Sequence, residues 1–151
     1  ALIVRREGKL TSTNVKTMPY PGFPTDMQPQ IAAVLCLAEG TSILNEGVWD
    51  NRYRYADEFR RMGANIQVNG KVAVIEGVRA LTGAPVCACD LRAGAAMIVA
   101  GLAANGVTEI DQVYHIERGH EGIVQKLSKL GADIHEEVIP EEDWRSSNGV
   151  G

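Results

Sequence analysis

The chain has 151 residues, 45% of them hydrophobic, which fits one domain of ordinary size with an apolar core. A net charge of -4 without any lysine or arginine run disfavours nucleic acid or an anionic membrane as the main partner. The sequence shows no secretory pattern and no apolar run of membrane-spanning length, and its three cysteines are too badly spaced for a disulfide framework. We therefore expect a cytoplasmic protein.

The first predicted elements are two strands, "ALIVRREGK" and "STNVKTMPY", which we interpret as the end of a repeat unit over residues 1–19. A fuller unit follows over about residues 20–78. It comprises an apolar helix that begins near Asp26 and stops at Gly40, the strand "TSILNE", a polar loop and the helix "YADEFRRMG". It ends in a hairpin, because "NIQVNGKVAVIEG" alternates in polarity around an Asn69–Gly70 turn.

A second unit, over about residues 84–139, has the same order of elements: the helix "RAGAAMIVAGLAAN", the strand "VTEID", a polar loop, the helix "EGIVQKLSKLG" and a strand beginning near Ala132. The chain therefore contains an internal repeat within a partial domain of residues 1–139, and residues 140–151 are expected to be a flexible tail. The matched positions of the two units are Asp26 and Asp90, Gly40 and Gly106, and Arg52 and Arg118.

The alternation of helices and strands predicts an α/β (α+β) fold. The first helix of the second unit has almost no polar face, and a helix that is apolar all round is buried on all sides. We therefore expect the helices inside and the sheets outside.

Asp26 and Asp90 each stand where an apolar helix is predicted to begin, and two roles are open for them. An aspartate at this place caps free backbone amides and complements the helix dipole, and its recurrence in both units favours this structural role. However, the prolines of "PGFPT" stiffen the approach to Asp26 more than a cap requires, because proline fixes φ. Asp26 is therefore also a candidate for catalysis or substrate binding.

Three arginines are candidates for binding an anion. Arg92 lies in the first turn of a helix, where the dipole opposes a cation, so we expect either Asp90 or an anionic ligand to compensate its charge. Arg52 and Arg118 lie in equivalent loops. They are either solvated, paired with neighbouring carboxylates, or part of a cationic pocket for phosphate or carboxylate.

Other kinds of chemistry find little support. His115 and His120 lack a third ligand at helical spacing, and Cys87 and Cys89 lack a partner pair, so we expect no metal site. There is no phosphate loop, dinucleotide fingerprint or nucleophile elbow, and we expect no cofactor. Cys36 lies in an apolar run and is expected to be an inert core thiol.

Three motifs in order, "PGFPTDMQ", "APVCACDLRAGA" and "YHIERGHE", resemble those of the UDP-N-acetylglucosamine enolpyruvyl transferase family of bacterial cell-wall synthesis, from about Arg5 to about Glu137. The resemblance implies repeated βαβαββ units with helices packed inside sheets, an inside-out α/β barrel with the active site in a cleft between two domains. It also implies the reaction: the sugar 3'-hydroxyl adds to phosphoenolpyruvate, and phosphate is then eliminated.

The resemblance assigns roles to individual residues. Asp26 matches the aspartate that binds the sugar hydroxyl and is proposed as its general base. Val48 in "NEGVWDNR" matches a position whose backbone contacts the sugar nucleotide, and Arg118 matches an arginine at the phosphoenolpyruvate site. Asp26 and Arg118 are thus expected to be catalytic. The remaining polar residues of the cleft, where cations would stabilise negative charge, match Arg52, Asp90 and Arg92.

The sequence also departs from this family. The family's Lys-Asn pair and its proton-donating loop cysteine have no counterpart here, and Cys36, Cys87 and Cys89 do not lie where they could replace that cysteine. We therefore expect a fragment of the C-terminal portion that is inactive alone and is completed by a missing N-terminal portion. Two alternatives stay open: a non-catalytic module that binds a sugar nucleotide or a partner chain and self-associates, and the related enolpyruvylshikimate phosphate synthase.

Overall fold

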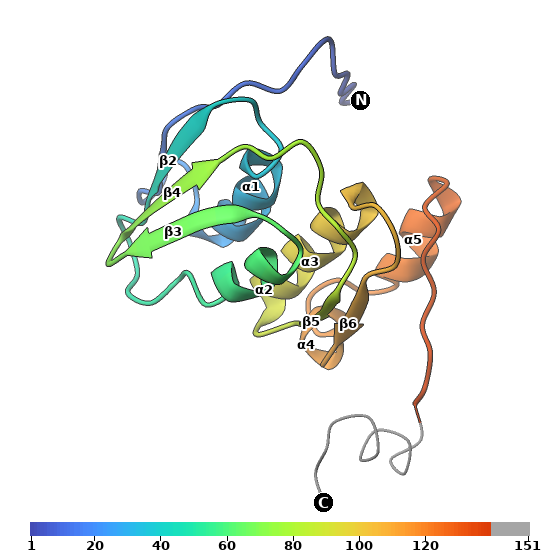
Figure 1. Cartoon of the computed structure of the whole chain (residues 1–151). Coiled ribbons are helices and arrows are strands. Elements are labelled where there is room, and N and C mark those ends of the chain that lie inside the picture. Colours follow the sequence, from blue (N-terminus) through green and yellow to red (C-terminus); the bar gives the residue numbers. More distant parts are fainter. Residues whose placement is uncertain (140–151) are drawn as a thin grey trace, which may run out of the picture. The chain divides into compact units, whose positions relative to one another are not determined.

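The computed structural model describes residues 1–139, so the tail predicted for residues 140–151 lies outside the described residues. The chain divides into two compact units, residues 1–120 and a unit that begins at Glu121. The second unit contributes the helix α5 (Ile123–Lys129). The elements of the first unit, drawn in Figure 1, are β1 (Val15–Lys16), the 3-10 helix η1 (Thr25–Met27), α1 (Gln28–Leu35), β2 (Thr41–Asn45), α2 (Ala56–Arg61), β3 (Asn65–Asn69), β4 (Val72–Glu76), β5 (Pro85–Cys87), α3 (Leu91–Ala103), β6 (Glu109–Asp111) and α4 (Tyr114–Glu117).

β1, from the segment predicted as the end of a preceding unit, joins the strands of the first repeat in a four-stranded sheet with the order β1-β2-β4-β3. β1 runs parallel to β2, whereas β4 pairs antiparallel with both β2 and β3. The chain order β1-α1-β2-α2-β3-β4 is the βαβαββ unit that the resemblance implies. The predicted hairpin is confirmed, because Asn69 pairs with Val72 and Gly70 in the intervening turn adopts a φ of 58°.

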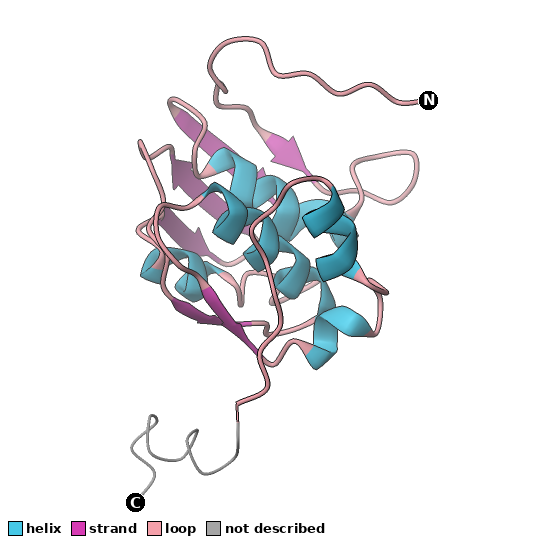
Figure 2. Ribbon diagram, turned by 90° about the vertical axis from the view of Figure 1, so that its right-hand side faces the viewer, coloured by secondary structure: helices cyan, strands magenta, loops and turns pink. Residues whose placement is uncertain are grey.

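The sheet has one buried and one exposed face. In β2, Ser42 and Leu44 are buried while Thr41 and Ile43 are exposed, which is the alternation expected of a strand with one face in a core. Helices α1 and α2 lie on the buried side, as Figures 1 and 2 show from two directions. The core between helices and sheet includes the fully buried Phe59.

Helices α1 and α3 are equivalent elements of the two repeats, and they pack against each other. Residues Ala93 to Ile98 and Ala100 of α3 are buried, so this helix lies largely inside the compact unit of residues 1–120, as predicted. The expectation that it is buried on all sides was wrong, because Val99 is 41% exposed and Leu102 is 44% exposed. No described element covers that face of α3, so its apolar side chains meet solvent.

In the second repeat, β5 and β6 pair in parallel, with Val86 opposite Ile110. The segment after β6, predicted as a polar loop, contains the short helix α4, which is anchored by the buried Ile116. The matched residues Gly40 and Gly106 both follow their helices with positive φ angles, 103° and 90°. Glycine tolerates this conformation without steric cost. The prediction that the first helix runs up to Gly40 was wrong, because α1 ends at Leu35, and α3 likewise ends at Ala103, before Gly106.

Two predicted strand regions differ from the structure. The N-terminal pair is reduced to β1, and residues 1–9 contain no strand. The strand expected from about Ala132 is absent from residues 132–139. An extended segment becomes a strand only when another backbone pairs with it, and no described segment does so for either stretch. Among the described helices, none combines the length and apolar character that a membrane crossing requires.

Candidate active site

The two matched aspartates, Asp26 and Asp90, have different roles in the structure. Asp90 is the N-cap of α3: its Oδ1 accepts hydrogen bonds from the backbone amides of Arg92 and Ala93, both at 2.9 Å. Asp26 lies within η1, and its side chain caps neither η1 nor α1. Its carboxylate is instead 64% exposed and forms an ion pair with Arg92, Oδ1 to Nε 2.5 Å. The capping role is thus confirmed for Asp90 and was wrong for Asp26.

The local sequence explains why Asp26 is not needed as a cap. Pro24 precedes η1 in an extended conformation, with a φ of -72° and a ψ of 134°, and Pro29 lies in the first turn of α1. Because Pro29 has no amide hydrogen, one of the free donors that a cap would satisfy is missing from this helix. The rigid approach therefore leaves the Asp26 carboxylate available to a partner outside its own helix.

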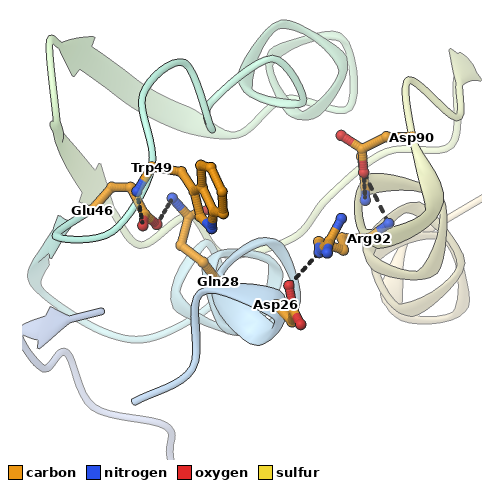
Figure 3. A network of polar contacts seen from close by, with 7 residues as sticks. Asp26, Gln28, Glu46, Trp49, Asp90 and Arg92 are labelled. Atoms are coloured by element: carbon orange, nitrogen blue, oxygen red, sulfur yellow. Dashed lines mark hydrogen bonds and ion pairs between the residues drawn. The ribbon is translucent and has the colours of Figure 1, made fainter. Parts of the chain in front are cut away.

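That partner is Arg92, which resolves the charge problem at the start of α3. The helix dipole opposes a cation in the first turn, and the sequence predicted that Asp90 or an anionic ligand would compensate the charge of Arg92. In the structure Asp90 binds backbone amides, while Asp26 binds the Arg92 guanidinium. The ion pair links the starts of α1 and α3, the equivalent helices of the two repeats (Figure 3).

The segment that carries Arg118 packs against α3 through two tight contacts at glycines. It follows α4, whose buried Ile116 packs so closely on Gly94 of α3 that a Cβ at Gly94 would overlap it. A Cβ at Gly119 would likewise overlap the side chain of Leu91, the first residue of α3. Arg118 itself is exposed, and the residue after it, Gly119, lies against the first residue of the helix that carries Arg92.

Val48 and Arg52 belong to a second cluster in the loop after β2. The amides of Val48 and Trp49 both donate to Oε1 of Glu46 at 3.1 Å. The Arg52 guanidinium carbon lies 5.7 Å from the centre of the Trp49 ring, within the range of a cation–π interaction. Asp50, a neighbouring carboxylate that could neutralise Arg52, pairs with Lys71 at 3.1 Å instead.

The two clusters are joined by residues that the sequence analysis missed. The carboxylate of Glu46 accepts a hydrogen bond from Nε2 of Gln28 at 3.2 Å, and Oε1 of Gln28 accepts one from the Tyr55 hydroxyl at 2.5 Å. Figure 3 shows Asp26 between the Glu46 group and the pair of Asp90 and Arg92. A signal for Glu46 was present in "TSILNE", because it continues the buried positions Ser42 and Leu44 at period 2.

The structure brings together Asp26, Asp90 and Arg92, packs the residue after Arg118 against the start of α3, and holds Val48 and Arg52 in the loop after β2. The described residues contain no group of three or more His, Cys, Asp or Glu side chains that could hold a metal ion. Burial raises the pKa of the Cys87 and Cys89 thiols, which disfavours the reactive thiolate. The chemical resources of this region are therefore one exposed carboxylate and a set of guanidinium groups.

Comparison with known proteins shows the family of the chain. A family model described as EPSP synthase (3-phosphoshikimate 1-carboxyvinyltransferase) matches residues 1–137. The UDP-N-acetylglucosamine 1-carboxyvinyltransferase 3 of Caldanaerobacter subterraneus subsp. tengcongensis is 56% identical over 131 residues, covering 87% of this chain and 31% of that protein. The UDP-N-acetylglucosamine 1-carboxyvinyltransferase of Nitratidesulfovibrio vulgaris is 52% identical over 137 residues, covering 91% and 33%. The resemblance inferred from the three motifs is thereby confirmed.

Solved structures show the same fold. The enolpyruvyl transferase NikO from Streptomyces tendae superposes with a TM-score of 0.80 at 33% identity, covering 87% of this chain and 30% of that one. The EPSP synthase from Acinetobacter baumannii superposes with a TM-score of 0.59 at 20% identity, which supports the fold alone. The predicted α/β fold of the enolpyruvyl transferases is confirmed. The chain spans about a third of the length of the curated relatives it matches.

Proposed function

Because the chain belongs to the EPSP synthase (3-phosphoshikimate 1-carboxyvinyltransferase) family, we propose that it is one part of an enolpyruvyl transferase acting on UDP-N-acetylglucosamine. The donor in this proposal is phosphoenolpyruvate, and the acceptor is the sugar 3'-hydroxyl. The choice of acceptor is supported by relatives at 52% to 56% identity that carry the name UDP-N-acetylglucosamine 1-carboxyvinyltransferase. The proposal places the enzyme in the cytoplasm, in the synthesis of peptidoglycan precursors.

The observation that carries the proposed mechanism is the ion pair between Asp26 and Arg92. The Asp26 carboxylate is exposed and is held by a guanidinium from the other repeat, so a hydroxyl of a bound sugar could reach it. In the addition step Asp26 accepts the proton of this hydroxyl while the sugar oxygen bonds to C2 of phosphoenolpyruvate. Protonation of C3 requires a donor from another part of the enzyme. Elimination then completes the transfer: a base removes a proton from C3, the C2–C3 double bond forms again, and the bond from C2 to the phosphate oxygen breaks to release phosphate.

The arginines have an electrostatic role in this proposal. Phosphoenolpyruvate carries a phosphate and a carboxylate, and guanidinium groups bind both through paired, charge-assisted hydrogen bonds. Arg92 in the first turn of α3 and Arg118, which follows α4, would bind the phosphoenolpyruvate anions, and Arg52 would contribute from the Trp49 loop. Their positive charge would stabilise the negative charge of the tetrahedral intermediate.

The proposal is tested with the full-length protein carrying Asp26→Asn. General base catalysis contributes roughly 100-fold to 10,000-fold to a rate, so we expect the rate of phosphate release to fall by at least about 100-fold. Binding of UDP-N-acetylglucosamine and the folded state should persist. Asp57→Asn is the matched control, because Asp57 is also an exposed aspartate paired with an arginine, Arg60, and it lies on α2.

The outcomes separate the alternatives. An unchanged rate in Asp26→Asn would contradict the assignment of the base. Binding of the sugar nucleotide without any phosphate release by the wild-type full-length protein would favour a non-catalytic module. Turnover with shikimate 3-phosphate but not with UDP-N-acetylglucosamine would identify the shikimate enzyme. For the isolated chain we propose self-association through the exposed apolar face of α3, which contains Val99 and Leu102.

A further inference from the structure

Glu46 is a buried carboxylate to which the proposed mechanism gives no task. Its side chain lies at the end of β2, and the residue is only 1% exposed. Burying a charge is costly unless it is paired or fully hydrogen-bonded. No lysine, arginine or histidine forms an ion pair with Glu46 in the described part of the chain, so its charge is balanced by hydrogen bonds alone.

These hydrogen bonds come from the loop that carries the proposed binding residues. Oε1 of Glu46 accepts the amides of Val48 and Trp49, both at 3.1 Å. The amide of Gly47, which lies between Glu46 and Val48, donates a hydrogen bond to the Thr17 hydroxyl at 2.9 Å. Three consecutive backbone amides are therefore fixed by two buried side chains. The Trp49 ring in turn lies beside the Arg52 guanidinium.

The other oxygen of Glu46 reaches the helix that follows Asp26. Oε2 accepts Nε2 of Gln28, a fully buried residue at the start of α1, and Gln28 is held in turn by the Tyr55 hydroxyl. Figure 3 shows Glu46 meeting Gln28 on one side and the backbone at Trp49 on the other. A single carboxylate thus connects the segment carrying Asp26 with the loop carrying Val48.

The charge of Glu46 is maintained by this environment. Burial alone would raise the pKa of the carboxyl group. The Thr17 hydroxyl and the amides of Trp49 and Val48 lower the pKa of Glu46. The nearby Thr25 hydroxyl also lowers this pKa, although it forms no regular hydrogen bond. The net pKa is lower than the ordinary value. An ionised carboxylate binds amides more strongly than a neutral group does, which favours a rigid loop.

We propose that Glu46 is a positioning residue, which holds the Val48 amide region and the Trp49–Arg52 pair in a fixed relation to Asp26 so that the sugar nucleotide finds a preformed site. The inference rests on the proposed function, because Val48, Arg52 and Asp26 are the proposed substrate contacts. It requires that loss of the Glu46 carboxylate weakens sugar-nucleotide binding even when the protein stays folded. A residue needed only for folding would lower the melting temperature and leave binding unchanged.

The main test is Glu46→Gln in the full-length protein. The introduced amide side chain can still accept the loop amides through its oxygen, but its NH₂ group then faces the NH₂ group of Gln28. Gln28 must turn its amide over, which leaves the buried Tyr55 hydroxyl without its acceptor. We expect the Kd of UDP-N-acetylglucosamine, measured by calorimetry, and its KM to rise about tenfold. Hydrogen exchange at the Val48 and Trp49 amides should become faster.

Two further variants make the test specific. The double variant Glu46→Gln with Gln28→Glu reverses donor and acceptor, so the hydrogen bonds among these side chains and the loop amides can form again, and it should restore the Kd to within about threefold. Glu58→Gln is the matched control, because Glu58 is also a buried carboxylate that accepts a backbone amide, that of Cys87 at 2.9 Å. It should lower the melting temperature and leave the Kd unchanged.

Each outcome has a defined meaning. An unchanged Kd and unchanged amide exchange in Glu46→Gln would overturn the inference and leave Glu46 a structural residue. If that variant does not fold, Glu46→Asp takes its place, since it keeps the charge and withdraws the carboxylate from the loop by one methylene group. If the wild-type protein does not bind UDP-N-acetylglucosamine, the proposed function fails, while amide exchange, which needs no substrate, still decides whether Glu46 holds the loop.

Discussion

The different roles of Asp26 and Asp90 predict a difference in stability that can be measured without substrate. Replacing Asp90 by alanine removes the acceptor for two amides at the start of α3, each now bound at 2.9 Å. Loss of such a cap costs about 1 to 2 kcal/mol, and loss of the negative charge near the helix dipole adds a few tenths. We therefore expect Asp90→Ala to lower the free energy of unfolding by about 1.5 kcal/mol.

Asp26→Ala should cost much less. It removes an ion pair in which the Asp26 side chain is 64% exposed and the Arg92 side chain 35% exposed. Exposed ion pairs contribute about 0 to 1 kcal/mol, because water and salt screen the charges. Asp26 also accepts no capping hydrogen bond whose donor would be left unpaired. We expect a loss of about 0.5 kcal/mol or less.

The assay is urea unfolding of the chain, monitored by circular dichroism. The two variants are compared with the same slope of the unfolding free energy against urea concentration. Asp90→Asn serves as a control, because asparagine keeps the acceptor oxygen and caps a helix about as well as aspartate. It should behave nearly as the wild type. If Asp26→Ala destabilised the chain as much as Asp90→Ala, Asp26 would be a structural residue and our reasoning about η1 would be refuted.

The remaining predictions concern the core and the uncovered face of α3. Burial raises the pKa of the Cys36 thiol from 9.0 to about 12, so the unfolded chain loses this proton first as the pH rises. Stability is therefore complete below pH 9.0 and falls towards pH 12 by about 1.4 kcal/mol per pH unit. Between pH 9 and 10 the loss should be about 1 kcal/mol, because the thiol of the unfolded chain is only half ionised at pH 9.0, and Cys36→Ala should remove this loss; an equal loss in both proteins would contradict the assignment. Sedimentation of the isolated chain should show self-association. The double variant Val99→Lys with Leu102→Lys should weaken this association, whereas the control Val74→Lys, on the exposed face of the sheet, should leave it unchanged.

The fold was predictable where the sequence pattern is local. The period-2 alternation in "TSILNE" and "NIQVNGKVAVIEG" predicted β2, β3 and β4, whereas Gly40 and Gly106 lie beyond the ends of α1 and α3 and did not mark them. Of the strands expected near the two ends of the described chain only β1 formed, because pairing depends on a partner that local sequence does not specify. The short helix α4 was missed, since four residues are too few for a helical period to show.

The candidate site could be predicted only in part, for a related reason. The matched aspartates and arginines were found because they recur in both repeats, but recurrence could not tell that Asp90 caps while Asp26 reaches Arg92. That distinction depends on Pro29 and on a contact between residues 66 positions apart in sequence. Glu46 does not recur in the second repeat, so a comparison of the repeats could not reveal it.

A duplicated unit offers a physical route to a site of this kind. When two copies of a unit pack with equivalent helices side by side, their helix starts come together, and each brings its aspartate to the same region. If both aspartates capped their helices, no carboxylate there would be available for chemistry. Here Pro29 reduces the need for a cap in one copy, and Arg92 in the other copy supplies a cation for the aspartate that is released. Chemistry thus becomes available where the two copies differ, while the packed helices that they share keep the site in place.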